Sequence, residues 1–158
     1  MAEDGDGSAR AAGESLGALF GFFNEIGIIN QLSSALLQKR LPDGVTVAQF
    51  SVLNHLIRVG DGQTPLAMAT AFQVPKTTMT HSLAGLARRG LVEMRANPSD
   101  GRSKCVWLTN AGRSFRDQAI GALAADAGRL SEALDFAEIA ATTPTLERVR
   151  KALDADRD

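Results

Sequence analysis

Between residues 76 and 88, apolar residues recur at intervals of three and four. Met79, Leu83 and Leu86 make one helical face, while small, polar and basic side chains occupy the other. Pro75 suits the first helical position because the N–H that it lacks would have no partner there. Gly90 followed by Leu91 is typical of a glycine that ends a helix with an apolar residue after it. The pattern predicts a helix with one core face and one polar face.

Two strand-like runs follow this helix, at residues 91–96 and 103–108. The turn-forming run NPSDG separates them, so a β-hairpin is expected. Alternation places Val92, Met94, Val106 and Leu108 on the face that packs on the helices, and Arg95, Ser103, Cys105 and Trp107 on the outer face. Basic residues cluster near the tip of the predicted hairpin.

Two shorter helices are expected before residue 76. Thr46 with Gln49 forms a capping-box pattern, and this helix is expected to end at Gly60. Thr64 is an N-cap followed by Pro65, which starts a second helix reaching Phe72. Only Gln73 and Val74 join that helix to the one expected to start at Pro75, which is the arrangement of a helix-turn-helix.

The two ends of the chain are predicted to be helical. Residues 15–44 carry two apolar stripes where a surface helix of a monomer needs one, which favours a helix shared with a second subunit. The alternative is a central helix buried in a monomer. Thr109 is expected to cap one long helix reaching residue 136. Thr143-Pro144 is expected to break the helical run and start another helix.

Composition limits the class of protein. The chain has 158 residues, 44% of them hydrophobic, enough for one domain or two small ones. Residues 1–14 are acidic and rich in Gly, Ala and Ser, so they are expected to be a disordered tail rather than a secretory signal. The chain has no run of 18 apolar residues, so no membrane span is predicted. A single cysteine agrees with a cytoplasmic location.

Charge is distributed unevenly. The net charge is −1, but residues 76–108 carry six Lys and Arg against two acidic residues, a local charge of +4. Residues 1–15 carry −3 and residues 109–158 carry −2. Because the local field governs contact with phosphates, the segment around the predicted hairpin is suited to nucleic acid.

Catalytic and cofactor chemistry is not indicated. The chain has two histidines and one cysteine, and His55, His81 and Cys105 lack the short spacings of metal ligands. We therefore expect no enzyme activity, no cofactor and no metal site. Cys105 is expected to be a passive strand residue; the alternative is a redox role with a thiolate stabilised by a nearby cation.

Three spaced motifs resemble those of the MarR family of bacterial transcriptional regulators. They are Gly90-Leu91-Val92, the run from Asn97 to Arg102, and Leu108-Thr109 followed by Gly112. The resemblance is sharpest from Thr64 to Gly112. It implies a mainly α protein with a small β-hairpin wing, in which a winged helix-turn-helix (45–109) is inserted between N-terminal (15–44) and C-terminal (110–158) dimerisation helices.

The same resemblance implies a homodimeric repressor that binds a pseudo-palindromic double-stranded DNA operator and is relieved by a small-molecule effector. Residues 76–82 would enter the major groove, and Arg102, oriented by Asp100, the minor groove. His81 stands where members often carry Arg, which leaves base preference open. Together, polarity and resemblance make the following residues candidates for DNA contact: Lys76, Thr77, Thr78, Thr80, His81, Ser82, Arg88, Arg95, Asp100, Arg102 and Lys104.

Effector contacts are predicted by region only, because spacing does not show which residues line a cavity. The regional candidates are Phe20, Phe23, Asn24, Asn30, His55 and Arg58. Two alternatives to a sequence-reading regulator are open, and the near-neutral total charge favours the first of them. One is a winged-helix dimer that binds protein without specific DNA binding; the other, an architectural DNA binder, calls for a more basic chain.

Overall fold

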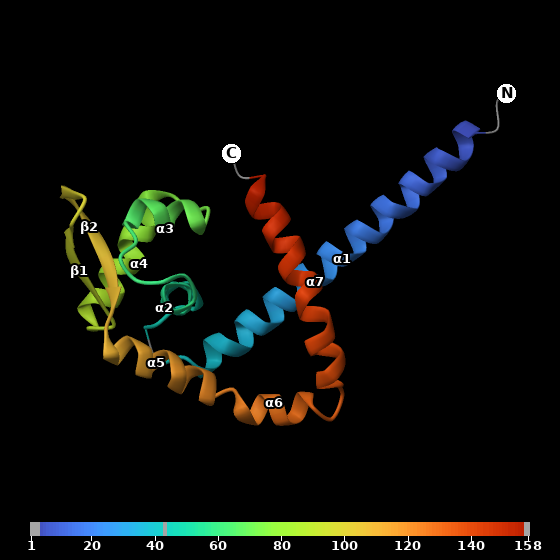
Figure 1. The fold of residues 1–158 in the computed structure, drawn as a ribbon. Coiled ribbons are helices and arrows are strands. Elements are labelled where there is room, and N and C mark those ends of the chain that lie inside the picture. Colours follow the sequence, from blue (N-terminus) through green and yellow to red (C-terminus); the bar gives the residue numbers. More distant parts are fainter. Residues whose placement is uncertain (1–3, 43, 157–158) are drawn as a thin grey trace. The chain divides into compact units, whose positions relative to one another are not determined.

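The structure is a computed structural model that describes residues 4–42 and 44–156, with backbone alone for residues 4–12. Its elements in chain order are α1 (Asp4–Arg40), α2 (Val47–Val59), α3 (Pro65–Ala71), α4 (Lys76–Arg88), β1 (Val92–Asn97), β2 (Asp100–Leu108), α5 (Asn110–Gly121), α6 (Ala124–Leu130) and α7 (Phe136–Ala155) (Figure 1). The chain divides into two compact units, residues 1–116 and 117–158, which we describe separately.

The predicted caps of α2 and α3 are confirmed. Thr46 accepts the backbone N–H of Gln49 (3.2 Å), and the Gln49 side chain accepts the backbone N–H of Thr46 (3.2 Å), so both halves of the capping box are present. Thr64 accepts the N–H of Ala67 (3.2 Å), and Pro65 starts α3. These side chains satisfy backbone donors that have no partner within the helix.

The connections around α4 differ slightly from the sequence prediction. Pro75 is the N-cap, with an extended ψ of 143°, and α4 begins one residue later, at Lys76. Gln73, in the turn before it, has a φ of 51°, a left-handed conformation that residues with a Cβ adopt at some cost. At the other end the predicted glycine stop is confirmed. Gly90 has a φ of 68°, and the Leu91 N–H donates to the Leu86 carbonyl (3.0 Å).

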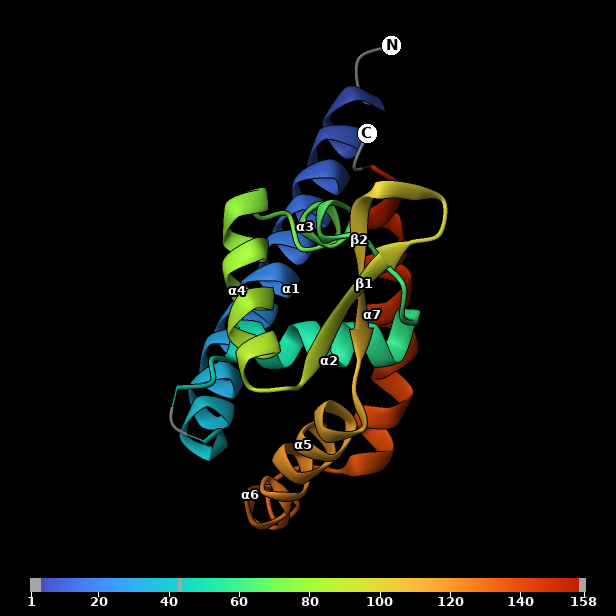
Figure 2. The same ribbon diagram turned by 90° about the vertical axis from the view of Figure 1, so that its left-hand side faces the viewer.

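The two strands form the predicted antiparallel hairpin, which lies beside α4 in both views (Figure 1, Figure 2). Val92 is paired with Leu108 and Met94 with Val106. Buried residues of α2, α3 and α4 pack with Val92, Val106 and Leu108 in one apolar core, and Phe115 of α5 packs against it. The winged module therefore has a core of its own.

Cys105 does not lie open on the outer face, as alternation predicted; its side chain is 3% exposed. The sequence pattern did not reveal that a further segment joins the sheet. Gln63 forms a bridge with Val106 on the free edge of β2, through Val106 N–H to Gln63 O (2.9 Å) and Gly62 N–H to Val106 O (2.9 Å). This isolated bridge brings the turn between α2 and α3 against β2 beside Cys105.

Helix α1 is longer than predicted. It begins at Asp4, so residues 4–14, expected to be a disordered tail, are helical; residues 1–3 lie outside the described part of the chain. Acidic residues stabilise the first turn of a helix, and three alanines follow them. The predicted turn after α1 includes Gly44, with a φ of 75°, while Asp43 lies outside the described residues.

The apolar stripes of α1 are only partly covered within one chain. Phe22, Ile26 and Leu36 are half-buried, whereas most of the other large apolar side chains of this helix are exposed. The exposed set is Leu16, Leu19, Phe20, Phe23, Ile28, Ile29 and Leu32. Within residues 1–116, these apolar side chains are therefore left uncovered.

The C-terminal helices differ from the prediction in two places. The single helix expected from Thr109 to residue 136 is divided into α5 and α6, with the break just after Gly121, a poor helix former. The chain then leaves α6 and starts α7 at an N-cap, Asp135, whose carboxylate accepts the N–H of Ala137 (2.7 Å). Asp135 with Glu138 three residues later is a capping signal that the sequence analysis missed.

Pro144 lies inside α7 instead of breaking the helical run. Proline removes one backbone hydrogen bond from the helix interior, but residues 136–144 are exposed, so water can hydrate the carbonyl left without its donor. The hydroxyls of Thr142 and Thr143 also donate to the carbonyls of Glu138 (2.8 Å) and Ile139 (3.0 Å). These side-chain bonds lie next to the carbonyl of Ala140, which is the one that loses its donor at Pro144 and lies in the exposed stretch.

Candidate nucleic-acid interface

The outer face of α4 carries most of the predicted contact residues. Lys76, Thr77, Thr78, Thr80 and His81 are exposed and Ser82 is half-buried, while Met79 and Leu83 on the opposite face are 2% and 3% exposed. Helix α4 contains no acidic residue. The Thr80 hydroxyl donates to the Lys76 carbonyl (2.8 Å), which orients it along the helix. The structure thus presents a row of donors and one cation at the first two turns.

Arg88 is not part of this row. At a rise of about 1.5 Å per residue it lies about 18 Å along the axis from Lys76, in the last turn of α4. A cation at a helix C-terminus is favoured by the helix dipole whatever else it binds. The structure therefore separates Arg88 from the polar residues of the first two turns.

Local hydrogen bonds shape the wing tip. The Asn97 amide donates to the Ser103 hydroxyl (2.9 Å), and its oxygen accepts the N–H of Ser99 (3.0 Å). The Asp100 carboxylate accepts the backbone N–H of Arg102 (3.0 Å), whereas the sequence analysis expected it to hold the Arg102 side chain. An aspartate two residues before an amide commonly closes such a turn. Asp100 therefore shapes the backbone of Arg102 and leaves its guanidinium without a partner among the described residues.

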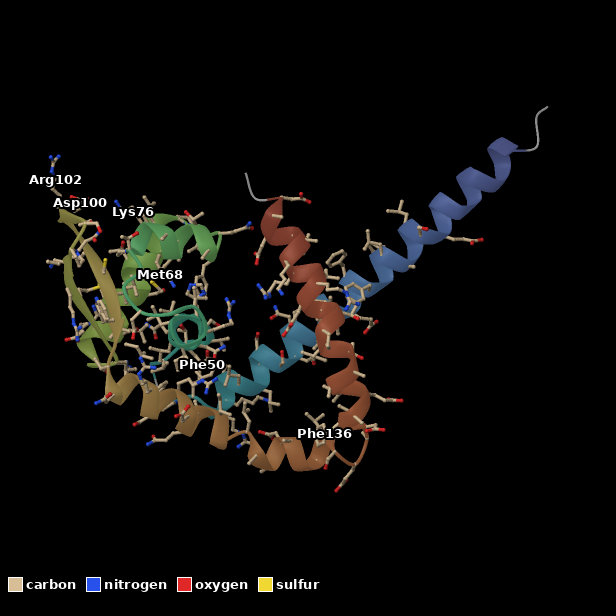
Figure 3. The ribbon with its side chains drawn as sticks, viewed as in Figure 1. Phe50, Met68, Lys76, Asp100, Arg102 and Phe136 are labelled. Carbon is tan, nitrogen blue, oxygen red and sulfur yellow. The ribbon has the colours of Figure 1, made fainter. Side chains whose placement is uncertain are left out.

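Arg102 extends beyond the wing tip, at the end of the module where Lys76 and the start of α4 also lie (Figure 3). Figure 2 agrees, since α4 begins at the same end at which the hairpin turns. No acidic partner neutralises the Arg102 side chain within the described chain. Two exposed cationic groups on separate elements therefore face the same side of the module.

Arg95 has a different setting from the other cations of the wing. It pairs with Cys105 across the hairpin, whereas Lys104 pairs with Ala96, so Arg95 and Lys104 project from opposite faces of the sheet. The Arg95 guanidinium lies 4.6 Å from the centroid of the Trp107 ring and forms an ion pair with Glu93. Glu93 was not among the predicted site residues, although strand alternation places it on the face of Arg95 and Trp107.

The regional effector candidates fall on two helices. Phe20, Phe23, Asn24 and Asn30 are exposed on α1. On α2, His55 Nε2 contacts the Gln63 side-chain oxygen (3.1 Å), and Arg58 contacts His55 Nδ1 (3.3 Å).

The His55 ring also meets the Phe72 ring edge-on, at 5.1 Å between centroids. Both nitrogens of the His55 ring therefore contact protein side chains, those of Gln63 and Arg58, and the ring itself contacts Phe72. The structure thus brings His55 and Arg58 together, and it gives them partners within the winged module.

Comparison with known proteins identifies the fold and the function class. The model of the MarR family matches residues 43–103. The transcriptional regulator HosA of Escherichia coli O111:H- is 33% identical over 98 residues, which are 62% of this chain and 71% of HosA. The crystal structure of wild-type MarR from E. coli without ligand is 30% identical and superposes with a TM-score of 0.67, over 80% of this chain and 94% of that one.

The chain belongs to the MarR family.

Membership confirms the predicted winged-helix fold and the class of transcriptional regulators rather than enzymes. Another MarR-family structure, a mutant of E. coli MarR in complex with operator DNA, is 28% identical, with a TM-score of 0.65 over 84% of this chain and 95% of that one. In the described part of the chain, no helix is long and apolar enough to cross a membrane.

Proposed function

We propose that this MarR-family regulator binds a specific operator as a homodimer, with the first two turns of α4 in the major groove and the wing tip in the minor groove. The observation that carries the proposal is the shared direction of Lys76 and Arg102, both exposed at one end of the module (Figure 3). A major groove about 12 Å wide admits a helix, and the negative potential of the minor groove attracts inserted arginine.

The residues that we propose to touch DNA have different tasks. Lys76 and Lys104 provide charge for phosphates; Arg102 supplies a free guanidinium for the minor groove. Thr77, Thr78, Thr80, His81 and Ser82 offer hydroxyl and imidazole groups for base edges or phosphates. Asp100 acts on the backbone beneath Arg102. The E. coli MarR complex with operator DNA supports this docking by likeness of fold.

The proposal of a homodimer rests on apolar surface that one chain leaves open. In α1 the exposed fraction is 68% for Leu16, 72% for Phe20 and 67% for Leu32. In residues 117–158, considered separately, Leu130, Leu134, Phe136 and Ile139 are exposed as well. Large exposed apolar patches mark interaction sites. A symmetric dimer would cover them and would match a pseudo-palindromic operator.

Repression and effector relief complete the proposal. Two half-sites one helical turn apart require one separation between the two modules. A small molecule that binds another separation more tightly therefore weakens operator binding by the difference in its affinity for the two states. The proposed ligand region includes His55 and Arg58 on α2 and the exposed face of α1.

The deciding experiment is a fluorescence-anisotropy titration of the protein onto the intergenic DNA beside its own gene, at two salt concentrations, with a scrambled duplex as control. We expect a preference for the native duplex of about a hundredfold or more, at two chains per duplex. Equal, salt-sensitive binding to both duplexes would refute sequence reading at that site. Absence of binding at low salt would favour the alternative of a protein-interaction module.

The wing contact has its own test. Arg102→Ala should weaken operator binding and reduce the slope of log Kd against log salt by about one unit for each phosphate that is no longer neutralised, thus about two for a dimer. Arg88→Ala is the matched control, because it removes the same charge from the far end of α4. Equal slopes for Arg102→Ala and the unmodified protein would remove Arg102 from the interface.

A further inference from the structure

Arg95 lies on the outer face of the wing, and its guanidinium is committed to neighbours within the protein. The register pairs Glu93 with Trp107 and Arg95 with Cys105, so all four side chains share one face of the hairpin. The Arg95 guanidinium stacks 4.6 Å from the Trp107 ring centroid and pairs with the Glu93 carboxylate. Its positive charge is thus offset within the protein.

Trp107 connects this face to the rest of the module. A Cβ placed on Gly62 would lie 3.5 Å from Cζ2 of Trp107, an ordinary van der Waals distance, so the ring lies beside the turn between α2 and α3. Gly62 has a φ of 87°, and its N–H donates to the Val106 carbonyl (2.9 Å). The indole therefore lies between Arg95 of β1 and the turn that pairs with β2.

The inner face of the hairpin is fixed differently. Val92, Val106 and Leu108 belong to the buried core at the base of the wing, whereas beyond Met94 both strands reach exposed residues. On the outer face, Arg95 of β1 and Trp107 of β2 join the two strands through a cation and an aromatic ring. A cation over an indole stabilises such a pair in an exposed position.

We propose that Arg95 is a positioning residue: by stacking on Trp107 and pairing with Glu93 it fixes the direction of the wing, and it supplies no cation to DNA phosphates. The inference deepens the proposed function, on which it rests for its DNA-binding readout. Arg102 and Lys104 then carry the charge of the wing, and Arg95 determines where that charge is held.

The test compares Arg95→Met with Arg102→Met, because methionine keeps an unbranched side chain without charge. Trp107 is the only tryptophan and the chain has no tyrosine, so intrinsic fluorescence reports on the surroundings of Trp107. Two quantities are measured: acrylamide quenching of Trp107 in the free full-length protein, and the dependence of duplex affinity on salt. Circular dichroism confirms that each variant is folded.

For Arg95→Met we expect stronger quenching of Trp107 and operator affinity lower by about fivefold, the size of one exposed cation–π contact with one exposed ion pair. The salt slope should stay unchanged, because every phosphate contact remains. Arg102→Met should show the reverse: a smaller slope and unchanged quenching. Arg95→Lys keeps a cation over the ring and should restore both the shielding of Trp107 and most of the affinity.

Three results would overturn the inference. They are a smaller salt slope in Arg95→Met, quenching equal to that of the unmodified protein, and stronger quenching without any loss of affinity. If the unmodified protein binds no duplex at all, the proposed function fails. The packing of Arg95 on Trp107 is then still decided by quenching in the free protein.

Discussion

Replacing Gly112 by alanine should loosen the start of α5 from the winged module. A Cβ at this position would lie 2.1 Å from the Leu91 carbonyl oxygen and 2.7 Å from Cδ1 of Leu108. Ordinary contacts between non-bonded heavy atoms begin near about 3.5 Å, so the first turn of α5 must retreat by more than about 1 Å. The atom in the way is a backbone oxygen of a buried residue, which cannot rotate aside as a flexible side chain would.

Retreat of α5 would also strain the bonds that hold its N-terminus. Thr109 Oγ1 accepts the Gly112 N–H (2.9 Å) and donates to the Gly90 carbonyl (2.7 Å). Overpacking costs about 1–3 kcal/mol, and loss of the threonine cap adds about 1 kcal/mol. Alanine returns about 1 kcal/mol through its higher helix propensity. We expect Gly112→Ala to lower the free energy of unfolding by about 1–3 kcal/mol.

Gly121→Ala is the matched control, because it is the same substitution in the same helix. No atom lies within 4 Å of the position that its Cβ would take. Its stability should equal or exceed that of the unmodified protein by up to about 1 kcal/mol. Urea unfolding, followed by helical ellipticity and by Trp107 fluorescence at one fixed protein concentration, measures both variants.

Gly112→Ala should have a lower midpoint at unchanged m-value. In thermal unfolding, a loss of about 1–3 kcal/mol corresponds to a midpoint lower by about 2–12 °C. If Gly112→Ala were as stable as Gly121→Ala, the close approach of α5 to the Leu91 carbonyl would not exist in solution. The role assigned to this glycine would then be wrong.

Three further substitutions test other parts of the structure. Phe20→Glu should shift the protein from dimer to monomer, as measured by light scattering after size-exclusion chromatography. Gln31→Glu on the same helix is the control and should leave the dimer intact. If Phe20→Glu remained a dimer, this face of α1 would not be part of the interface. Asp61→Ala should lower the free energy of unfolding by about 1–3 kcal/mol, because the Leu108 N–H (2.8 Å from Asp61 Oδ1) loses its acceptor. Asp61→Asn keeps an acceptor and should lower the free energy of unfolding by less. Gln73→Gly should stabilise by up to about 1 kcal/mol in urea unfolding, because φ is 51° there, and destabilisation would show that the Gln73 side chain contributes more than its strain costs.

Local chemistry made the helix ends of the winged module predictable from sequence. The capping box at Thr46, the cap and proline at Thr64 and the glycine stop at Gly90 each depend on residues within about four positions of one another, so tertiary contacts have little influence on them. The same holds for the hairpin turn.

Contacts between distant segments were not predictable in the same way. Strand alternation placed Cys105 on an open face, because nothing local shows that Gln63 joins the edge of β2 more than forty residues away along the chain. Asp100 was expected to bond the Arg102 side chain, but its carboxylate accepts the Arg102 backbone N–H, which the turn brings within reach. Two errors in the C-terminal helices have opposite signs. Pro144 was expected to break a helix that in fact continues through it, and the break after Gly121 was missed because one helix was expected across it.

The placement of apolar residues links stability to function in this regulator. Residues 52–108 contribute the buried apolar core of the winged module, and Phe115 from α5 packs against it. The exposed leucines and phenylalanines of α1 and of residues 117–158 lie outside that core, and contact of their apolar surface with water is unfavourable. In the proposed homodimer a second chain buries them, and the free energy of that burial would hold two winged modules at one separation. A single substitution in the apolar face of α1 should thus reduce operator affinity without changing any residue that we place on DNA. The reason is that two winged modules that are no longer joined would bind their half-sites independently.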